Sequence, residues 1–149
     1  MIGKLFAGFK KEETQTEADA LPRAFAAMLI EAARADEDYT EEERRLIDRT
    51  LAAKFSLTSE EAGALRTQAE ADQAASNDLY KFTSVLKDGL DRDGKIALIE
   101  DLWRVVLSDE ERDPHEEMVI RRLVGLIHLE DTDSHRARQR VEAGEAGEA

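Results

Sequence analysis

The sequence predicts an all-α protein, a single-domain bundle of about six to seven helices with two similar helix–loop–helix halves. Three observations lead to this prediction. Alanine, glutamate, leucine and arginine dominate the 149 residues, and there are only two prolines. Apolar side chains recur every three or four residues, the period of an amphipathic helix, and no stretch alternates as a half-buried strand would. The length fits one domain, because domains most often have about 100–150 residues.

Three regions of the chain differ in composition. Residues 1–19 form an amphipathic segment and a polar linker, residues 20–141 contain the apolar stripes, and residues 142–149 form a short tail of alanine, glycine and glutamate. Such a tail has nothing to bury, so we expect it to be disordered. The helical domain is therefore expected over residues 20–141.

Capping signals mark three helix starts. In residues 40–43 and 58–61 a threonine precedes a glutamate by three positions, as in a capping box. Residues 113–116 form an acidic variant with proline at the first helical position, where its missing amide hydrogen costs nothing. Helices are therefore predicted to begin at these three places.

Apolar stripes predict the bodies of the helices. Five stripes contain large side chains: Phe25, Met28, Leu29, Ala32 and Ala33; Ile47, Leu51 and Phe55; Leu79, Phe82, Leu86 and Leu90; Ile96, Ile99, Trp103 and Val106; and Ile120, Leu123, Val124 and Ile127. A thinner stripe of Ala62, Leu65 and Ala69 predicts a surface helix over residues 58–75 that packs through small side chains. Stripes of this kind usually form the core, so we assign them no binding role.

The chain contains an internal repeat. A shift of 73 residues aligns residues 24–51 with residues 97–124 and brings seven identical residues into register among 28 positions. The identical pairs are Ala24/Ala97, Leu29/Leu102, Asp36/Asp109, Glu37/Glu110, Glu43/Glu116, Ile47/Ile120 and Arg49/Arg122. Apolar positions and a cap signal also coincide without a gap. We interpret the repeat as two helix–loop–helix units, although two charged amphipathic helices can also match by chance.

Each repeat has a dense run of carboxylates at its bend, called here the first and second acidic corners. Residues 36–43 include six acidic side chains and residues 109–116 include five. Glutamates that start the later helix are favoured by its positive end, whereas Asp36 and Asp109 close the preceding helix, where its negative end disfavours them. The helix dipole therefore explains only half of this pattern.

A divalent cation would relieve the remaining repulsion, and carboxylate oxygens favour calcium, magnesium or manganese. The candidate metal ligands are Asp36, Asp38, Glu43, Asp109, Glu111 and Glu116. The first corner begins like an EF-hand loop, but its sixth position is Glu41 instead of glycine and its twelfth is Ile47 instead of glutamate, which excludes that motif. The alternative interpretation is that these carboxylates are solvated caps and loop charges.

Over residues 20–141 the chain resembles the tellurite-resistance protein TerB family, in particular its uncharacterised bacterial members. The resemblance rests on the duplicated helix–corner–helix pattern and on four motifs, at residues 31–36, 39–44, 102–103 and 135–141. It implies an all-α domain of about seven helices with two similar halves. It also implies that clustered acidic residues bind a divalent metal in stress-response systems associated with the inner membrane.

The resemblance also assigns individual residues. The family's aspartate at the end of the first helix of each half corresponds to Asp36 and Asp109, and its glutamate early in the next helix corresponds to Glu43 and Glu116. In the family a glycine commonly follows that aspartate, whereas both repeats have glutamate there. Glycine adopts a left-handed backbone at little cost, so this departure bears on the shape of the corner and on metal binding.

No catalytic signature is present, and we predict that the chain is not an enzyme. Without cysteine it has no disulfide framework, thiolate nucleophile or cysteine-ligated metal centre. It also lacks a His-Glu-x-x-His pair, a glycine-rich phosphate loop and a nucleophile elbow. We interpret His128 as a helix-terminal or packing residue and His135 as part of a basic run.

A net charge of −13 repels phosphate backbones, so we expect no nucleic-acid partner and favour cations or basic protein surfaces. No apolar run reaches the roughly 20 residues that span a bilayer, and we predict a cytoplasmic protein. Residues 1–11 combine one apolar helical face with lysines, which is typical of weak peripheral contact with the inner membrane and equally compatible with a docked or frayed end.

These observations lead to two functional hypotheses. The first is a non-enzymatic TerB-like binding or sensing module whose acidic face binds a divalent metal in bacterial stress response. The alternative is a metal-independent protein-interaction adaptor in which the same face docks a basic partner. Both hypotheses predict a protein partner, and metal titration separates them.

Overall fold

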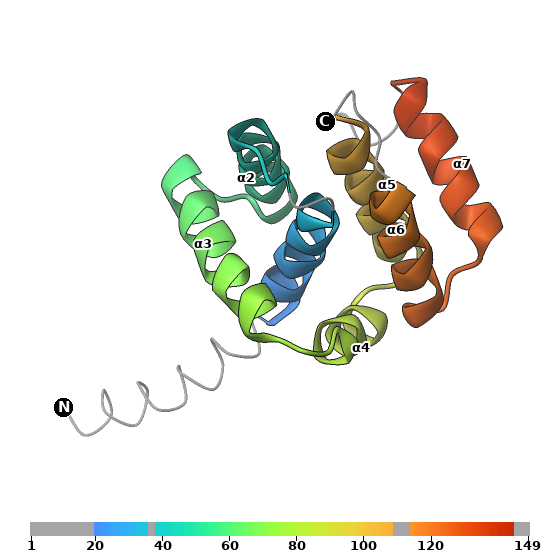
Figure 1. Cartoon of the computed structure of the whole chain (residues 1–149), viewed down its shortest axis with the longest axis horizontal. Helices are drawn as coiled ribbons and strands as arrows, with labels where there is room; N and C mark the ends of the chain where they lie inside the picture. Colours follow the sequence, from blue (N-terminus) through green and yellow to red (C-terminus); the bar gives the residue numbers. More distant parts are fainter. Residues whose placement is uncertain (1–19, 36–37, 109–113, 145–149) are drawn as a thin grey trace.

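The computed structural model describes residues 20–35, 38–108 and 114–144, with only the backbone of residues 114–116 (Figure 1). These ranges contain no strand and seven helices, one over residues 20–34 and six labelled α2 (Glu41–Phe55), α3 (Ser59–Ala75), α4 (Tyr80–Gly89), α5 (Arg92–Leu107), α6 (Pro114–Leu126) and α7 (Asp131–Glu142). The predicted all-α bundle is confirmed. The predicted amphipathic segment at residues 1–11 and most of the predicted tail lie outside the described ranges.

The predicted capping boxes start α2 and α3. The hydroxyls of Thr40 and Thr58 each accept a hydrogen bond of 3.1 Å from the glutamate amide three residues later, and each glutamate carboxylate accepts one of 2.9 Å from the threonine amide. α7 begins with a related contact that the sequence did not predict, in which the carboxylate of Asp133 accepts a hydrogen bond of 3.0 Å from the amide of Glu130. α6 begins at Pro114, as its proline signal predicted.

α2 and α6 also end in the same way. Ser56 and His128 adopt a left-handed backbone, with φ of 55° and 66°. The amides of Leu57 and Leu129 then donate back to the carbonyl five residues earlier, at 2.9 Å in both cases, which is the Schellman arrangement. His128 is therefore a helix-terminal residue, as one of the two predicted roles requires.

The internal repeat corresponds to two similar three-helix halves. Figure 1 shows the helix over residues 20–34 with α2 and α3 on one side, α5 with α6 and α7 on the other, and α4 between them. The 73-residue shift places α5 on the helix over residues 20–34 and α6 on α2. Equivalent core positions are buried in both halves, for example Leu29 and Leu102 or Ile47 and Ile120.

The core lies along the helix over residues 20–34, where burial exceeds the prediction. The sequence predicted one apolar face, but every residue from Ala24 to Ile30 is buried, the alanines between the large side chains included. Residues 24–30 are buried on all sides because their helix lies between α2 and α3 on one side and α5 on the other (Figure 1). The helix is tied to α3 by Arg23, whose guanidinium donates two hydrogen bonds of 2.9 Å to Asp72.

α3 packs through small side chains, as predicted, with Ala62 and Ala69 buried against the core. No helix in the described ranges combines the length and the apolar character needed to cross a lipid bilayer.

Candidate functional site

The first acidic corner joins the helix over residues 20–34 to α2, and its described part begins at Asp38. Asp38, Glu41 and Glu42 are exposed, whereas Glu43 is 2% exposed. Asp36 lies outside the described residues. Of the predicted ligands at this corner, the structure therefore describes two: Asp38, which is at the surface, and Glu43, which is buried.

Glu43 has a structural role at the start of α2. Its Oε1 atom accepts hydrogen bonds from the amide of Thr40 at 2.9 Å and from the hydroxyl of the same residue at 3.2 Å. Replacing a good helix cap typically costs about 0.5–2 kcal/mol of stability. The sequence predicts both the capping box and a candidate ligand at Glu43, but it does not predict that this carboxylate is buried.

Tyr39 connects the corner to α3. Its hydroxyl donates a hydrogen bond of 2.6 Å to Oε2 of Glu70. Two guanidinium groups lie over its ring, with Arg34 at 5.1 Å and Arg44 at 4.7 Å from the ring centroid. Contacts of this kind stabilise the ring through its negative faces. No sequence pattern indicated this contact, because the two partners are 31 residues apart.

Arg66 completes the network below the corner. It donates hydrogen bonds to Asp48 at 2.6 Å and to Glu70 at 3.0 Å. Burial raises the pKa of Glu70, but the hydrogen bonds from Tyr39 and Arg66 and the nearby guanidinium charge outweigh burial, so this pKa lies below its ordinary value. Glu70 therefore stays ionised and holds the corner to α3.

The second acidic corner lies almost wholly outside the described residues. Asp109 and Glu111 fall in the undescribed stretch, and Glu116 belongs to α6 but its side chain is not described. Within the described ranges, no three carboxylate, histidine or cysteine side chains come together as a metal site. The predicted metal site therefore depends on residues outside those ranges and stays a prediction.

The helices that lead into the two corners are arranged alike. In Figure 1 the carboxyl ends of α5 and of the helix over residues 20–34 lie at the same end of the molecule. The equivalent positions in the two repeats thus leave the bundle on one side.

Comparison with known proteins gives one match. A family model described as tellurite resistance protein TerB matches residues 22–139. No curated protein and no solved structure matches the chain. The matched range begins in the first described helix and ends in α7, so it includes both halves of the bundle and both acidic corners.

Proposed function

The chain belongs to the tellurite resistance protein TerB family, and on this premise we propose that it is a non-enzymatic module that binds a divalent cation at its acidic corners. The cation compensates the charge of the clustered carboxylates. Its binding stabilises the folded protein by mass action, because the unfolded chain does not bring these carboxylates together and does not bind the cation.

One observation supports this proposal most directly. Arg44 and Arg45 at the start of α2 both pair with Glu41, at 3.2 and 4.0 Å. Arg34 and Arg66 bind acceptors outside the corner, on α3 and α2. The two arginines at the start of α2 thus converge on one of the six carboxylates of this corner. The run of carboxylates at this corner therefore retains negative charge that a bound cation would compensate.

The donor chemistry of the corners fits a hard cation. Calcium, magnesium and manganese prefer carboxylate oxygens, and a cation at these corners would take its ligands from Asp36, Asp38, Asp109, Glu111 and Glu116. Glu43 is the exception, because one of its carboxylate oxygens is used by the cap of α2. We assign it the role of fixing the backbone that presents Asp38.

Titration calorimetry and thermal unfolding with calcium, magnesium and manganese test the proposal. We expect saturable heat with at least one ion and a stabilisation of about 2.7 kcal/mol when the free ion exceeds its dissociation constant a hundredfold. The double variant Asp36→Asn with Asp109→Asn should lose both effects.

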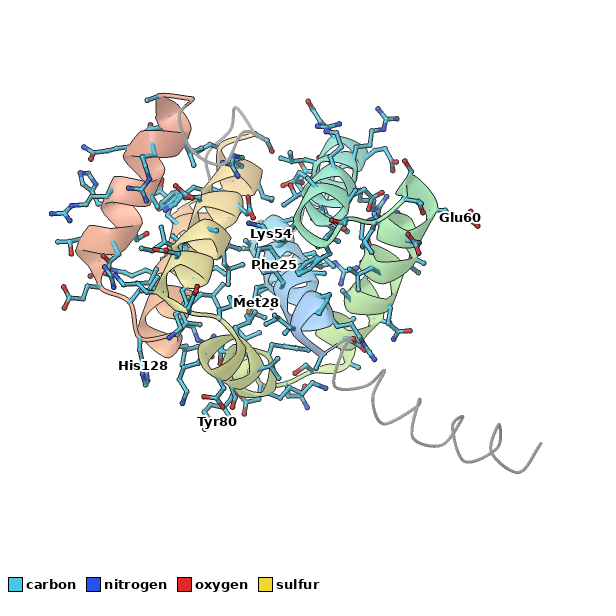
Figure 2. All side chains as sticks on the ribbon, turned by 180° about the vertical axis from the view of Figure 1, so that it is seen from behind. Phe25, Met28, Lys54, Glu60, Tyr80 and His128 are labelled. Atoms are coloured by element: carbon cyan, nitrogen blue, oxygen red, sulfur yellow. The ribbon has the colours of Figure 1, made fainter. Side chains whose placement is uncertain are left out.

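The matched control is Glu60→Gln with Asp93→Asn, which removes the same charge at exposed positions of α3 and α5, and Figure 2 shows Glu60 projecting from the surface. This control should bind like the wild type. Absence of heat and of any thermal shift at millimolar ion, or equal loss in the control, would overturn cation binding.

A metal-independent adaptor is the second candidate function. It is favoured by the exposure of two carboxylates of the first corner to solvent. Glu41 and Glu42 stand exposed at the start of α2, where a basic protein surface can reach them. A partner captured equally well with and without a chelator, and lost on Glu41→Gln with Glu42→Gln, would support the adaptor. A partner that requires calcium or manganese would contradict it.

A further inference from the structure

A pocket of about 370 Å³ opens between α6 and α7. Its floor is Trp103 of α5, which is 6% exposed and donates a hydrogen bond of 3.1 Å from its indole nitrogen to the hydroxyl of buried Ser134. Met118 at its rim is 63% exposed, which is unusual for a large apolar side chain in this bundle. The pocket thus combines an aromatic floor with an accessible apolar edge.

The equivalent place in the first half of the protein lies between α2 and α3, which pack closely together. Arg66 and Arg138 are equivalent, since each lies eight positions after the N-cap of its helix. In the first half the arginine is held by Asp48 of α2 at 2.6 Å. The repeat places Arg121 at the corresponding position of α6, and two guanidinium groups cannot form such a pair.

The packing of the third helix of each half follows this difference. α3 packs closely along α2, whereas α7 makes most of its contacts with α5 and far fewer with α6. Arg121 lies at the position of Asp48. The bond from Arg138 to α6 is therefore made by Glu117 instead, at 3.3 Å compared with 2.6 Å in the first half. A pocket is open between α6 and α7 above Trp103.

The two arginines of the open groove differ in how firmly they are held. Arg138 lies 4.8 Å from the centre of the Trp103 ring and donates to Glu117 at 3.3 Å. Arg121 reaches Asp131 at only 3.9 Å, and 78% of its side chain is exposed. A pair this exposed and this long contributes little, so Arg121 is available to a ligand.

We propose that this pocket binds a small apolar carboxylate. The carboxylate of the ligand lies between Arg121 and Arg138, where it takes the role that Asp48 has in the first half. Guanidinium groups bind carboxylates through charge-assisted hydrogen bonds, often in pairs. The hydrocarbon part of the ligand lies on Trp103 and Met118, and the volume suits a ligand of modest size.

Trp103 is the only tryptophan of the chain, so its fluorescence reports on this pocket alone. We expect 3-phenylpropionate, added to about 20 mM, to change the emission of the full-length protein with a dissociation constant in the millimolar range. The neutral analogue 3-phenylpropanamide should bind about tenfold more weakly. An unchanged emission, or equal binding of the acid and the amide, would overturn the proposal.

The Arg121→Asp variant provides the sharpest test, because it restores the acid–arginine pair of the first half and should close the groove. Binding of 3-phenylpropionate should be lost, while circular dichroism shows intact helices. Arg122→Asp makes the same change in charge at a neighbouring residue that is also exposed, and this variant should bind within about twofold of the wild type. Arg121→Gln, which only removes the positive charge, should weaken binding about tenfold. Equal effects at the two positions would refute the assignment.

Apolar carboxylates occur both as free acids and as the carboxyl ends of peptides. Glycylglycylphenylalanine with a free carboxyl end presents the same phenyl ring and carboxylate on a peptide. Tighter binding of this peptide than of 3-phenylpropionate would identify peptide ends as the source of the ligand, and weaker binding would identify a free acid. If the Arg121→Asp variant still binds both the peptide and 3-phenylpropionate, the pocket does not bind carboxylates in the proposed way.

Discussion

Tyr39 stands directly before the capping threonine of α2, yet its hydroxyl reaches a carboxylate on α3, 31 residues further along the chain. Burial, followed by the hydrogen bond to Glu70, raises the pKa of Tyr39, so the phenol stays protonated and keeps donating. Glu70 in turn accepts from Arg66. Glu70 of α3 therefore links Tyr39 of the first corner to Arg66.

This link predicts how the stability of the protein changes in acid. Because the pKa of Glu70 lies below its ordinary value of 4.5, its ionised form stabilises the fold above that pH, and the contribution is lost as the pH falls through the folded-state pKa. Glu70→Gln should lower the free energy of unfolding by about 1–3 kcal/mol at neutral pH. The difference from the wild type should shrink in acid.

Urea unfolding between neutral pH and pH values below 4.5 measures this difference. Glu60→Gln is the control, because the same change at an exposed carboxylate should have little effect at any pH. A gap between the wild type and Glu70→Gln that stays constant or widens in acid would contradict the role of Glu70.

Among the helices, α3 shows how little apolar surface an element needs when small side chains pack closely. Ala62 and Ala69 are fully buried, and Leu65 is only half-buried. The first turn is stabilised by the capping box of Thr58, while the middle of the helix includes a glycine, Gly63, which favours the helical backbone least among ordinary residues. The stability of α3 therefore has room to increase without any change in packing.

Gly63→Ala should raise the free energy of unfolding by about 0.5–1 kcal/mol. A Cβ atom at this position would have no neighbouring atom within 4 Å, so the gain in backbone entropy is not offset by a clash. Gly89→Ala at the end of α4 is the comparison, because its Cβ would lie 3.1 Å from Cδ1 of Leu21. Denaturant unfolding that shows a larger gain for Gly89→Ala than for Gly63→Ala would contradict this account.

Considered as a whole, the molecule consists of two related halves. The contacts that join them have no equivalent under the repeat. Lys54 of α2 lies 3.4 Å from buried Asp101 of α5, and its ammonium group is 5.5 Å from the ring centre of Phe25 (Figure 2). Arg104 also pairs with Asp101. The repeat places Met28 at the position equivalent to Asp101, so this ionic contact breaks the symmetry where the halves meet.

The joining contact carries a pH dependence opposite in sign to that of Glu70. Burial holds the pKa of Asp101 above its ordinary value of 3.8, although Lys54 and Arg104 oppose this effect. A carboxyl group with a raised folded-state pKa stabilises the fold below its ordinary pKa and loses that contribution as the pH rises through the folded-state value. We expect the wild type to lose stability relative to Asp101→Asn as the pH rises through this range.

Thermal unfolding of the wild type and of Asp101→Asn, followed as the pH rises from about 3.8, measures this effect. The control is Asp93→Asn, at an exposed position of the same helix. It should change the free energy of unfolding by no more than about 0.5 kcal/mol at any pH. If the wild type instead becomes more stable relative to Asp101→Asn as the pH rises, the prediction is wrong. The attraction of Asp101 to Lys54 and Arg104 would then outweigh the effect of burial.

The helices, their caps and the duplication were predictable from the sequence because they depend on residues three or four positions apart or on a constant shift along the chain. The capping glutamates of Thr40 and Thr58 are examples. The candidate metal site was predictable only as a set of residues, since most of its members lie outside the described ranges. The burial of Glu43 was missed because a capping pattern does not reveal which face of the helix meets the core.

The sequence by itself determined that this protein is an all-α bundle of two similar halves, because periodicity and capping are local properties. Only the tertiary structure decided that Tyr39 binds Glu70 and that Asp101 meets Lys54 between the halves. It also decided that a pocket opens beside Trp103 between α6 and α7, whereas Arg66 joins α3 to Asp48 of α2. These features join residues far apart in the chain, and such contacts form only when helix packing brings the side chains within reach.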